Sequence, residues 1–237
     1  MIILYNNFMQ QFFTDESLNI GQKSSLSKEV LYQLRKVLRA EDGYEFRLAD
    51  KDGKIFLCAL EKDCACVNKE LDEDNELKTE ITAIVSLIKN DKMDLMVQKL
   101  TELGVRRIVP YKAFRSVVKE GKGDNKLERF KKIAREAAEQ SHRNIIPEIT
   151  GYAGINDLSK YMSELNIAAY EKDDHIVSDF RNHNSITFII GPEGGFDPVE
   201  IEKIKDMGFI SLSLGKRILR AETASIYITS LIVGDNQ

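Results

Sequence analysis

The chain contains the stretch Ile186-Thr187-Phe188-Ile189-Ile190-Gly191-Pro192-Glu193-Gly194-Gly195-Phe196, in which an apolar run passes directly into a glycine-rich loop. The apolar run is typical of a buried strand, and the loop predicts a tight turn with exposed backbone groups. A helix start follows at once. Asp197 can cap, Pro198 takes the first helical position, and Glu200 completes a capping box. Gly208 is expected to end this helix.

Strands and helices alternate on both sides of this unit, which predicts an α/β domain with a mostly parallel sheet and helices on its faces. A helix is expected over 92–103, because Met93, Met96, Val97 and Leu100 recur at helical spacing before Gly104. The other expected strands are 81–87, 107–110, 167–170 and 210–213. The other expected helices are 125–141, with Asp124 as N-cap, and one that begins at about residue 221.

Residues 1–70 are expected to form a separate β-rich domain, with residues 71–237 as the α/β domain. The run from Glu70 to Glu76 holds five acids in seven residues, which is typical of an exposed linker, and the boundary is placed there. Apolar segments at 2–5, 44–48 and 55–60 predict strands, the last two joined by the turn Asp50-Lys51-Asp52-Gly53.

A helix is also expected within this first domain, over residues 27–38. Ser27 is its predicted N-cap, and Leu31, Leu34 and Leu38 are expected to share one buried face.

Composition indicates a globular protein: of 237 residues, 43% are hydrophobic and 30% charged. No apolar run is long enough to span a bilayer, and the N-terminus lacks the features of a secretory signal, so we expect a cytoplasmic protein that does not bind membranes. The cysteines are Cys58, Cys64 and Cys66. We expect them on one alternating strand of half-buried thiols, with no metal site.

The net charge of −4 hides a basic block. From Arg106 to Arg143 there are twelve Lys or Arg against five Asp or Glu. Such a block is either a phosphate-binding face or a solvated helix surface, and charge alone does not separate the two interpretations.

Two loops carry the candidate chemistry, and each follows a predicted strand. They are Ile190–Phe196 and Leu214–Ala224. Ligands of open α/β sheets bind at the carboxyl ends of strands, so the loops predict a nucleotide-like ligand site; the alternative is a pair of structural turns. Neither loop is a known phosphate loop. The first lacks the Gly-x-Gly-x-x-Gly register, and Gly215-Lys216 has no glycine five residues before it.

Taken together, these segments resemble the bacterial 16S rRNA uridine N3-methyltransferase family, within the SPOUT class of knotted methyltransferases. The matching segments, in the family's order, are 37–39, 98–105, 115–118, 135–143 with Pro147-Glu148, 191–196 and 214–224. The chain departs from the family pattern at three points. Ala221 stands where the family often has Thr, Asp42-Gly43 replaces the glycine-aspartate pair, and basic residues near the N-terminus are few.

The resemblance implies a PUA-like β-barrel over residues 1–70 that helps to bind RNA. It implies a SPOUT-type α/β domain with a deep C-terminal trefoil knot, an exception to the near absence of knots. It also implies a homodimer that uses S-adenosyl-L-methionine as cofactor and acts on 16S rRNA in the 30S subunit. The residues expected to hold the cofactor are Tyr170, Gly191, Pro192, Gly194, Gly195, Leu214, Gly215, Ile218, Leu219, Thr223 and Ala224.

Methylation of uridine N3 requires a base, because the nitrogen is a poor nucleophile while protonated. Glu222 is the first candidate for the proton acceptor and Glu193 the second. Arg220 is expected to stabilise charge on the uracil oxygens or to hold a phosphate. A structural alternative stands beside this hypothesis, since acids such as Glu222 are favoured in the first turn of any helix.

Six residues are candidates for RNA contacts, and for each the alternative is a surface charge or an intramolecular pair. Arg135 and Arg143 lie about two helical turns apart, so both can share one face if the helix extends that far. The six are Arg39, Lys99, Arg115, Arg135, Gln140 and Arg143.

Other classes of protein remain open at this point. One is a non-catalytic RNA-binding or ribosome-assembly factor that keeps the fold, although the intact glycine and Glu222-Thr223-Ala224 motifs argue against it. Another is a SPOUT enzyme that acts on tRNA or on a ribose hydroxyl. The third is a nucleotide-binding metabolic enzyme.

Overall fold

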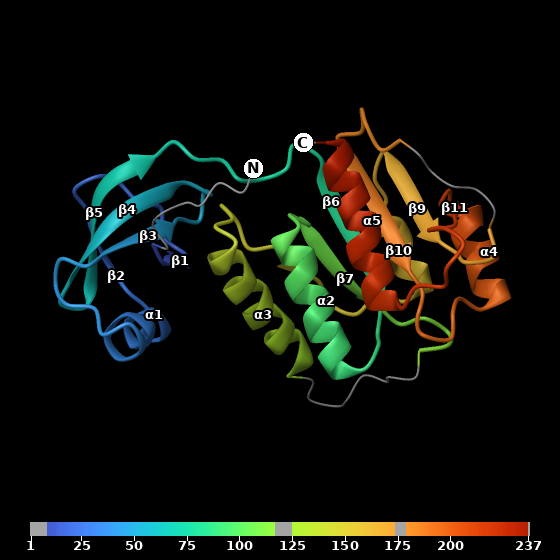
Figure 1. Ribbon diagram of the computed structural model, residues 1–237, viewed down its shortest axis with the longest axis horizontal. Helices are drawn as coiled ribbons and strands as arrows, with labels where there is room; N and C mark the ends of the chain where they lie inside the picture. Colours follow the sequence, from blue (N-terminus) through green and yellow to red (C-terminus); the bar gives the residue numbers. More distant parts are fainter. Residues whose placement is uncertain (1–8, 117–124, 174–178, 237) are drawn as a thin grey trace. The chain divides into compact units, whose positions relative to one another are not determined.

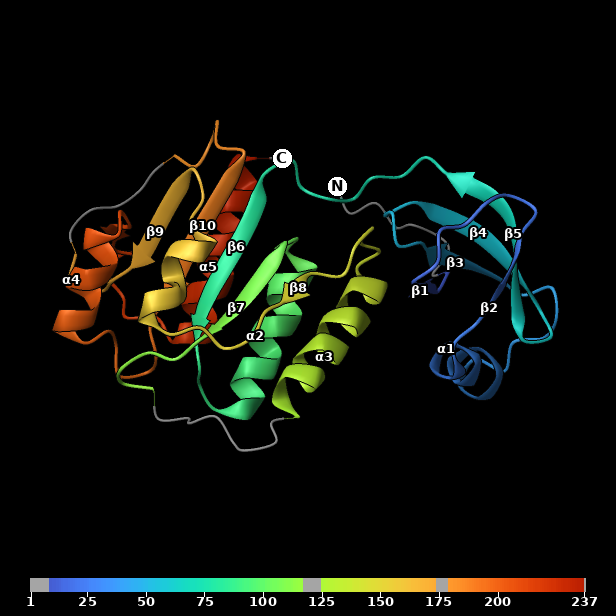
Figure 2. The same ribbon diagram turned by 180° about the vertical axis from the view of Figure 1, so that it is seen from behind.

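The computed structural model describes residues 9–116, 125–173 and 179–236. The chain divides into two compact units, drawn in Figures 1 and 2. The first comprises Met1–Glu76 and Ala138–Ile145, and the second Leu77–Ala137 and Ile146–Gln237. The return of 138–145 to the first unit was not expected from the sequence. The expected strand at 2–5 and the Asp124 cap lie outside the described residues.

The first unit is built on a five-stranded sheet with the order β1-β3-β4-β5-β2. β1 pairs parallel with β3 and the other pairs are antiparallel, with a register shift between Leu57 and Cys58. The core includes Phe46, Leu48 and Phe56, which are 0 or 1% exposed. The strands are β1 Gln11–Phe13, β2 Lys23–Ser25, β3 Glu45–Ala49, β4 Ile55–Glu61 and β5 Cys64–Leu71.

The expected hairpin is confirmed as β3 and β4, which pair antiparallel. The Asp50 carboxylate accepts hydrogen bonds of 2.9 Å from the backbone amides of Asp52 and Lys54, and Gly53 takes a positive φ of 80°. This side-chain bonding within the turn is what makes Asp a strong turn residue.

The helix of this unit begins as expected, but its second half winds differently. Ser27 caps α1 (Lys28–Tyr32) by accepting from the Val30 amide at 3.2 Å, and the chain continues as a π-helix, η1 (Gln33–Val37). A π-helical turn holds more residues than an α-helical one, so residues at α-helical spacing no longer lie on one face of the helix. Leu34 is buried, but Leu38 is 38% exposed and the expected face is wrong there.

The cysteines do not share one strand, and that expectation is corrected. Cys58 lies on β4, whereas Cys64 and Cys66 lie on β5. Cys58 is fully buried, and burial raises the pKa of its thiol to about 12.

The second unit is built on a six-stranded sheet, ordered β11-β9-β10-β6-β7-β8, in which every adjacent pair is parallel. The predicted α/β fold with a parallel sheet is therefore confirmed. Its strands are β6 Glu80–Ser86, β7 Arg107–Tyr111, β8 Glu148–Ile149, β9 Leu165–Ala169, β10 Ser185–Ile190 and β11 Ile210–Leu212. Its helices are α2 Asn90–Glu102, α3 Lys126–Gln140 (the part up to Ala137), the 3-10 helix η2 Ile155–Tyr161, α4 Pro198–Asp206 and α5 Ala221–Asp235.

Helices cover both faces of this sheet (Figures 1 and 2). α2, α3 and α5 pack on one face, where the predicted apolar stripe of α2 is buried together with Phe130, Ile228 and Ile232. η2 and α4 pack on the other face through Leu158, Ile201 and Ile204. In the described part of the chain, no helix is long and apolar enough to cross a membrane.

Candidate active site

A pocket of about 640 Å³ lies where three neighbouring parallel strands, β11, β9 and β10, reach their carboxyl ends. Each strand supplies the segment that follows it, and the starts of α2 and α5 close the remaining sides. The volume suits a nucleotide-sized ligand. The lining residues are Lys92, Ala169, Tyr170, Glu171, Ile190, Gly191, Pro192, Glu193, Gly194, Gly195, Phe196, Ser213, Leu214, Gly215, Arg217, Ile218, Leu219, Arg220, Ala221 and Ala224.

The loop after β10 needs its glycines for two different reasons. A Cβ on Gly191 would lie 3.1 and 3.2 Å from ring atoms of Phe196, which is itself buried. Gly195 has φ +68°, and its Cβ would lie 3.1 Å from Oε1 of Glu171. The amide of Gly195 donates to the Pro192 carbonyl at 2.8 Å, which closes the turn. The loop thus presents bare backbone to the pocket.

The loop after β11 supplies apolar side chains and a second stretch of open backbone. Gly215 has φ +110°, and no atom lies within 4 Å of where its Cβ would be. Leu214 and Leu219 pack against the core, whereas Ile218 is 86% exposed. Arg220 then forms the N-cap position of α5, and its side chain stays exposed beside the pocket.

The candidate proton acceptor lies in the first turn of α5. Glu222 is 9% exposed, and its Oε1 is 3.6 Å from Nζ of Lys92. The same ammonium is 4.0 Å from Oε1 of Glu193. Oε2 of Glu222 is buried, with no hydrogen-bond partner in the ranges 9–116, 125–173 and 179–236. The two candidate carboxylates therefore share one cation.

Lys92 was missed by the sequence reasoning. It lies in the first turn of α2, just after β6, and β6 is the neighbour of β10 in the sheet. The signal that points to it is positional, since residues that follow adjacent parallel strands gather at one edge. Using that signal requires the strand order, which local patterns do not supply.

The RNA methyltransferase domain model matches residues 75–233, which include the whole pocket. The chain is 32% identical to the ribosomal RNA small subunit methyltransferase E of Bacillus subtilis, over 94% of this chain and 96% of the relative. The corresponding protein of Aquifex aeolicus is 34% identical over 84% of this chain and 89% of its own length. This chain belongs to the ribosomal RNA small subunit methyltransferase E family.

A solved member of the family comes from Neisseria gonorrhoeae, and its crystal structure holds bound S-adenosyl methionine. It superimposes on this chain with a TM-score of 0.85 at 33% identity, covering 94% of this chain and 95% of that one. The mixed α/β architecture described above is therefore the architecture of this methyltransferase family.

In the present chain, ten of the eleven residues expected to hold the cofactor line the pocket. Thr223 does not line it, and its side chain is exposed. Of the residues expected to take part in catalysis, Glu193 and Arg220 line the pocket. Glu222 does not line it, but its Oε1 is 3.6 Å from Nζ of the lining residue Lys92.

Arg115 is the RNA candidate that lies beside the pocket. Its guanidinium pairs with Asp197 at 3.2 Å and reaches the Gly194 carbonyl at 3.5 Å. The segment that carries it is fixed by Glu200, a fully buried carboxylate that accepts from the Tyr111 hydroxyl at 2.7 Å and the Phe114 amide at 2.9 Å. Burial and then the hydrogen bond to Glu200 raise the pKa of Tyr111.

Four other RNA candidates lie elsewhere. In the second unit, Lys99 on α2 forms an ion pair with Glu102 at 2.8 Å, and Arg135 on α3 is half-buried. Gln140 at the end of α3 is exposed and belongs to the first unit. Arg39 is exposed in the first unit, with a positive φ of 55°.

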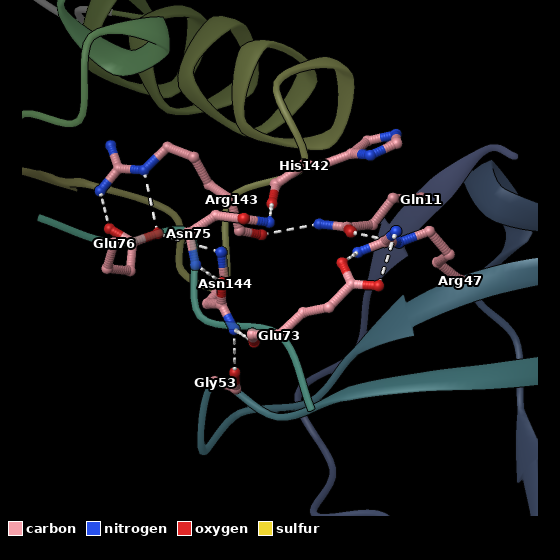
Figure 3. A network of polar contacts seen from close by, with 9 residues as sticks. All are labelled: Gln11, Arg47, Gly53, Glu73, Asn75, Glu76, His142, Arg143 and Asn144. Atoms are coloured by element: carbon pink, nitrogen blue, oxygen red, sulfur yellow. Dashed lines mark hydrogen bonds and ion pairs between the residues drawn. The ribbon is translucent and has the colours of Figure 1, made fainter. Parts of the chain in front are cut away.

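Arg143 does not present the exposed guanidinium that its predicted role requires. α3 ends at Gln140, His142 takes a positive φ of 56°, and the Arg143 side chain, only 3% exposed, turns inward. It donates to Glu76 at 3.2 and 2.6 Å, as Figure 3 shows. The expectation that Arg135 and Arg143 share one helix face is therefore corrected, because the helix stops before Arg143.

The contacts around Arg143 also explain why the acidic run 70–76 is not a free linker (Figure 3). Glu76 accepts from the backbone amides of Asn144 and Ile145 at 3.0 and 3.3 Å, in addition to Arg143. Glu73 forms an ion pair with Arg47. These acids are held inside the first unit by partners distant in sequence.

Proposed function

We propose that this protein is an S-adenosyl-L-methionine-dependent methyltransferase that methylates N3 of a uridine in the 16S rRNA of the small ribosomal subunit. The observation that carries the proposal is the pocket at the ends of β9, β10 and β11, in a chain 33% identical to a family member solved with S-adenosyl methionine. The names of the curated relatives support small-subunit rRNA as the substrate.

The residues of the pocket fit this cofactor. Gly191, Gly195 and Gly215 leave room for close approach to the backbone, and Leu214 and Leu219 offer apolar surface for the adenine ring. When bound, the cofactor supplies a methyl group carried on a positively charged sulfur.

The chain's own residues would prepare the uridine. Glu222, whose carboxylate lies 3.6 Å from the pocket-lining Lys92, accepts the proton of N3, so that the nitrogen lone pair is free to react. Arg220, exposed at the rim, stabilises the charge that develops on the uracil oxygens. Glu193, the more exposed carboxylate, is the second candidate for the proton acceptor.

The path of the chain supports the SPOUT-type trefoil knot. β11 is an edge strand paired with β9, yet the next helix, α5, packs on α2, β6 and β10. The last segment therefore crosses back over strands formed earlier in the chain. Arg220, Ala221 and Ala224, which follow this return, line the same pocket as the loop after β10 and Lys92 of α2.

The same proposal includes a PUA-like role for the first unit and a homodimer. The five-stranded sheet of the first unit and its exposed Arg39 suit a small RNA-binding module.

Ile218, Tyr227 and Leu231 are 86, 44 and 37% exposed on the second loop and α5, where a partner subunit would cover them. With 16S rRNA of the 30S subunit as substrate, the site of action is the cytoplasm.

Methyl transfer from labelled S-adenosyl-L-methionine to 30S subunits that lack their native modifications tests the function. We expect N3-methyluridine in the 16S rRNA, identified by mass spectrometry of the digested nucleosides. Subunits that already carry the modification are the control and should take up no label. Binding of the cofactor without any label in 16S rRNA would contradict the substrate, and tRNA and 23S rRNA would then be tested.

A further inference from the structure

The segment after β7 carries an exposed aromatic ring on a fixed backbone. The amide of Phe114 donates to the buried carboxylate of Glu200 at 2.9 Å. The amide of Ser116 donates to the carbonyl of Ala113 at 3.0 Å, which closes a turn around Phe114. Ala113 is buried, whereas the side chain of Phe114 is 52% exposed. The turn is therefore anchored in the core while its large apolar side chain remains at the surface.

A lysine and a second apolar side chain lie with this ring. Nζ of Lys203 is 5.9 Å from the centroid of the Phe114 ring. Val199 is 59% exposed and lies four residues before Lys203, so both side chains share one face of α4. Arg115 is the next residue of the turn. We call Phe114, Arg115, Val199 and Lys203 the outer patch.

The outer patch borders the loop that lines the candidate active site. The guanidinium of Arg115 reaches the carbonyl of Gly194 at 3.5 Å and pairs with Asp197 at 3.2 Å. A Cβ on Gly194 would lie only 3.7 Å from Cβ of Arg115, and Gly194 lines the pocket. A polymer whose target base enters the pocket therefore has the outer patch directly beside its path.

The charges of this surface favour an anionic partner. Arg115 is paired with Asp197, and the exposed Glu202 of α4 is paired with Lys205 at 3.2 Å. Lys203 is exposed and has no acidic side chain within ion-pair distance in residues 9–116, 125–173 and 179–236. Its ammonium is thus the charge that a partner would meet beside the ring.

An aromatic ring with a cation beside it fits a nucleotide of single-stranded RNA. A base stacks on the ring whatever its sequence, and the ammonium pairs with the phosphate. A stable protein interface would need about 20 to 30 residues a side, far more than the outer patch offers. α4 covers the opposite face of the sheet from α5, so the patch is also separate from the exposed residues of α5.

We propose that the outer patch binds a single-stranded nucleotide that flanks the target uridine: the ring of Phe114 stacks on its base, and the ammonium of Lys203 pairs with its phosphate. Val199 extends the apolar surface beneath the nucleotide, and Arg115 holds the turn against the glycine loop. This inference rests on the proposed function and names a part of its RNA-binding surface.

The test compares Phe114→Ala, Phe114→Leu and Phe114→Trp on 30S subunits that lack their native modifications. Phe114→Ala and Phe114→Leu should raise KM for the subunits about 10-fold, the loss expected when one stacked base is released. Stacking outside the pocket is equal in the ground state and the transition state, so kcat should stay within about 3-fold. Phe114→Trp retains a ring and should keep the KM of the wild type.

Lys203→Met tests the phosphate contact, with Lys78→Met as the control on another exposed lysine that does not line the pocket. Affinity for a short single-stranded RNA of uridines is measured at several salt concentrations. Loss of one phosphate contact should lower the slope of log affinity against log salt by about 0.7. Lys78→Met should keep the slope of the wild type.

Stacking can be followed without turnover when the same short RNA contains one 2-aminopurine, whose fluorescence falls when it stacks. The wild type and Phe114→Trp should quench this fluorescence, and Phe114→Leu should not. Calorimetry with S-adenosyl-L-methionine should find the same cofactor affinity in all variants, because none of the substituted residues lines the pocket.

Equal KM and equal quenching in the wild type and Phe114→Leu would overturn the inference, as would absence of any binding of the short RNA to the wild type. A loss in Phe114→Ala that Phe114→Leu restores would also overturn it, because the ring would then make an apolar contact of the kind a protein partner offers. Failure of the wild type to methylate 16S rRNA would instead contradict the proposed function, and the quenching comparison would still decide whether Phe114 stacks on RNA.

Discussion

The hydroxyl of Tyr111 donates a 2.7 Å hydrogen bond to Glu200, and both side chains are completely buried. Tyr111 ends β7, whereas Glu200 belongs to the first turn of α4. Because Glu200 also accepts from the amides of Phe114 and Asp197, it joins the segment that carries Arg115 to the end of the glycine loop. One buried carboxylate thus fixes two segments beside the pocket.

Tyr111→Phe removes one donor from this buried carboxylate and should lower the free energy of unfolding by about 2 kcal/mol. Urea denaturation followed by fluorescence measures the change. Tyr32→Phe is the control, since Tyr32 is 62% exposed and its loss of a hydroxyl should have little effect. If the two variants were equally stable, the hydrogen bond from Tyr111 to Glu200 would make no measurable contribution to the free energy of unfolding.

Glu76→Gln should destabilise the protein by about 3 kcal/mol, because it removes the carboxylate charge that Glu76 places against the buried guanidinium of Arg143. The matched control is Glu148→Gln, which breaks the exposed 2.6 Å pair with Arg107 and should change stability by less than about 1 kcal/mol. Both are measured by denaturant unfolding. Similar values for the two would contradict a structural role for Arg143.

Raising the pH should weaken the fold through Cys58. Burial raises the pKa of this thiol to about 12, from an ordinary value of 9.0. Above pH 9 the unfolded chain releases this proton and the folded chain keeps it, so the free energy of unfolding falls as pH rises toward 12. Urea unfolding between pH 8 and about pH 10.5 should therefore show a steeper decline for the wild type than for Cys58→Ala. Parallel declines would contradict this prediction.

Gly191→Ala should weaken binding of S-adenosyl-L-methionine about 10-fold, roughly 1.4 kcal/mol. The added methyl would lie 3.1 Å from the ring of Phe196, which is 3% exposed and has little room to move. Gly151→Ala is the control, because nothing lies within 4 Å of its Cβ position and its φ is not positive. Calorimetry should find wild-type affinity for the control. Unchanged affinity in Gly191→Ala would contradict the prediction, because the loop would then have moved to accommodate the methyl group without loss of binding.

Glu222→Gln keeps the shape of the side chain and removes its ability to take up a proton. We expect kcat to fall at least about 100-fold, within the range of general-base catalysis, with unchanged cofactor affinity. Glu202→Gln, on the exposed face of α4, is the control and should retain full turnover. Full turnover in Glu222→Gln would exclude Glu222 as the base and direct attention to Glu193.

Local signals were sufficient where a structure depends on neighbours in the sequence. The start of α4 is an example: Asp197 accepts from the Val199 amide at 2.9 Å, and Glu200 completes the capping box as expected. The buried stripe of α2 followed in the same way from the spacing of its apolar residues. The strands flanking α4 were also located: β10 is a compact apolar run before a loop rich in glycine, and β11 follows the glycine at which α4 was expected to end.

Features that depend on distant partners were not accessible to such reasoning. The order β11-β9-β10-β6 brings Lys92 to the pocket, and no local pattern encodes that order. Arg143 was placed on a helix surface because its spacing from Arg135 fits a helix. Its burial depends on Glu76, which lies 67 positions earlier. The expected burial of Leu38 was wrong for a similar reason, because the spacing of the apolar residues does not reveal the π-helical winding of η1.

The contacts of Glu76 have a consequence for the modularity of the protein. The first unit consists of two separate stretches of sequence, and the second of them, Ala138–Ile145, supplies the partners of Glu76 and Asn75. A gene fusion that joined this unit to another protein at one point, after residue 76, would omit those partners. Any exchange of the unit between proteins would need two simultaneous insertions, so the two units are expected to be inherited together.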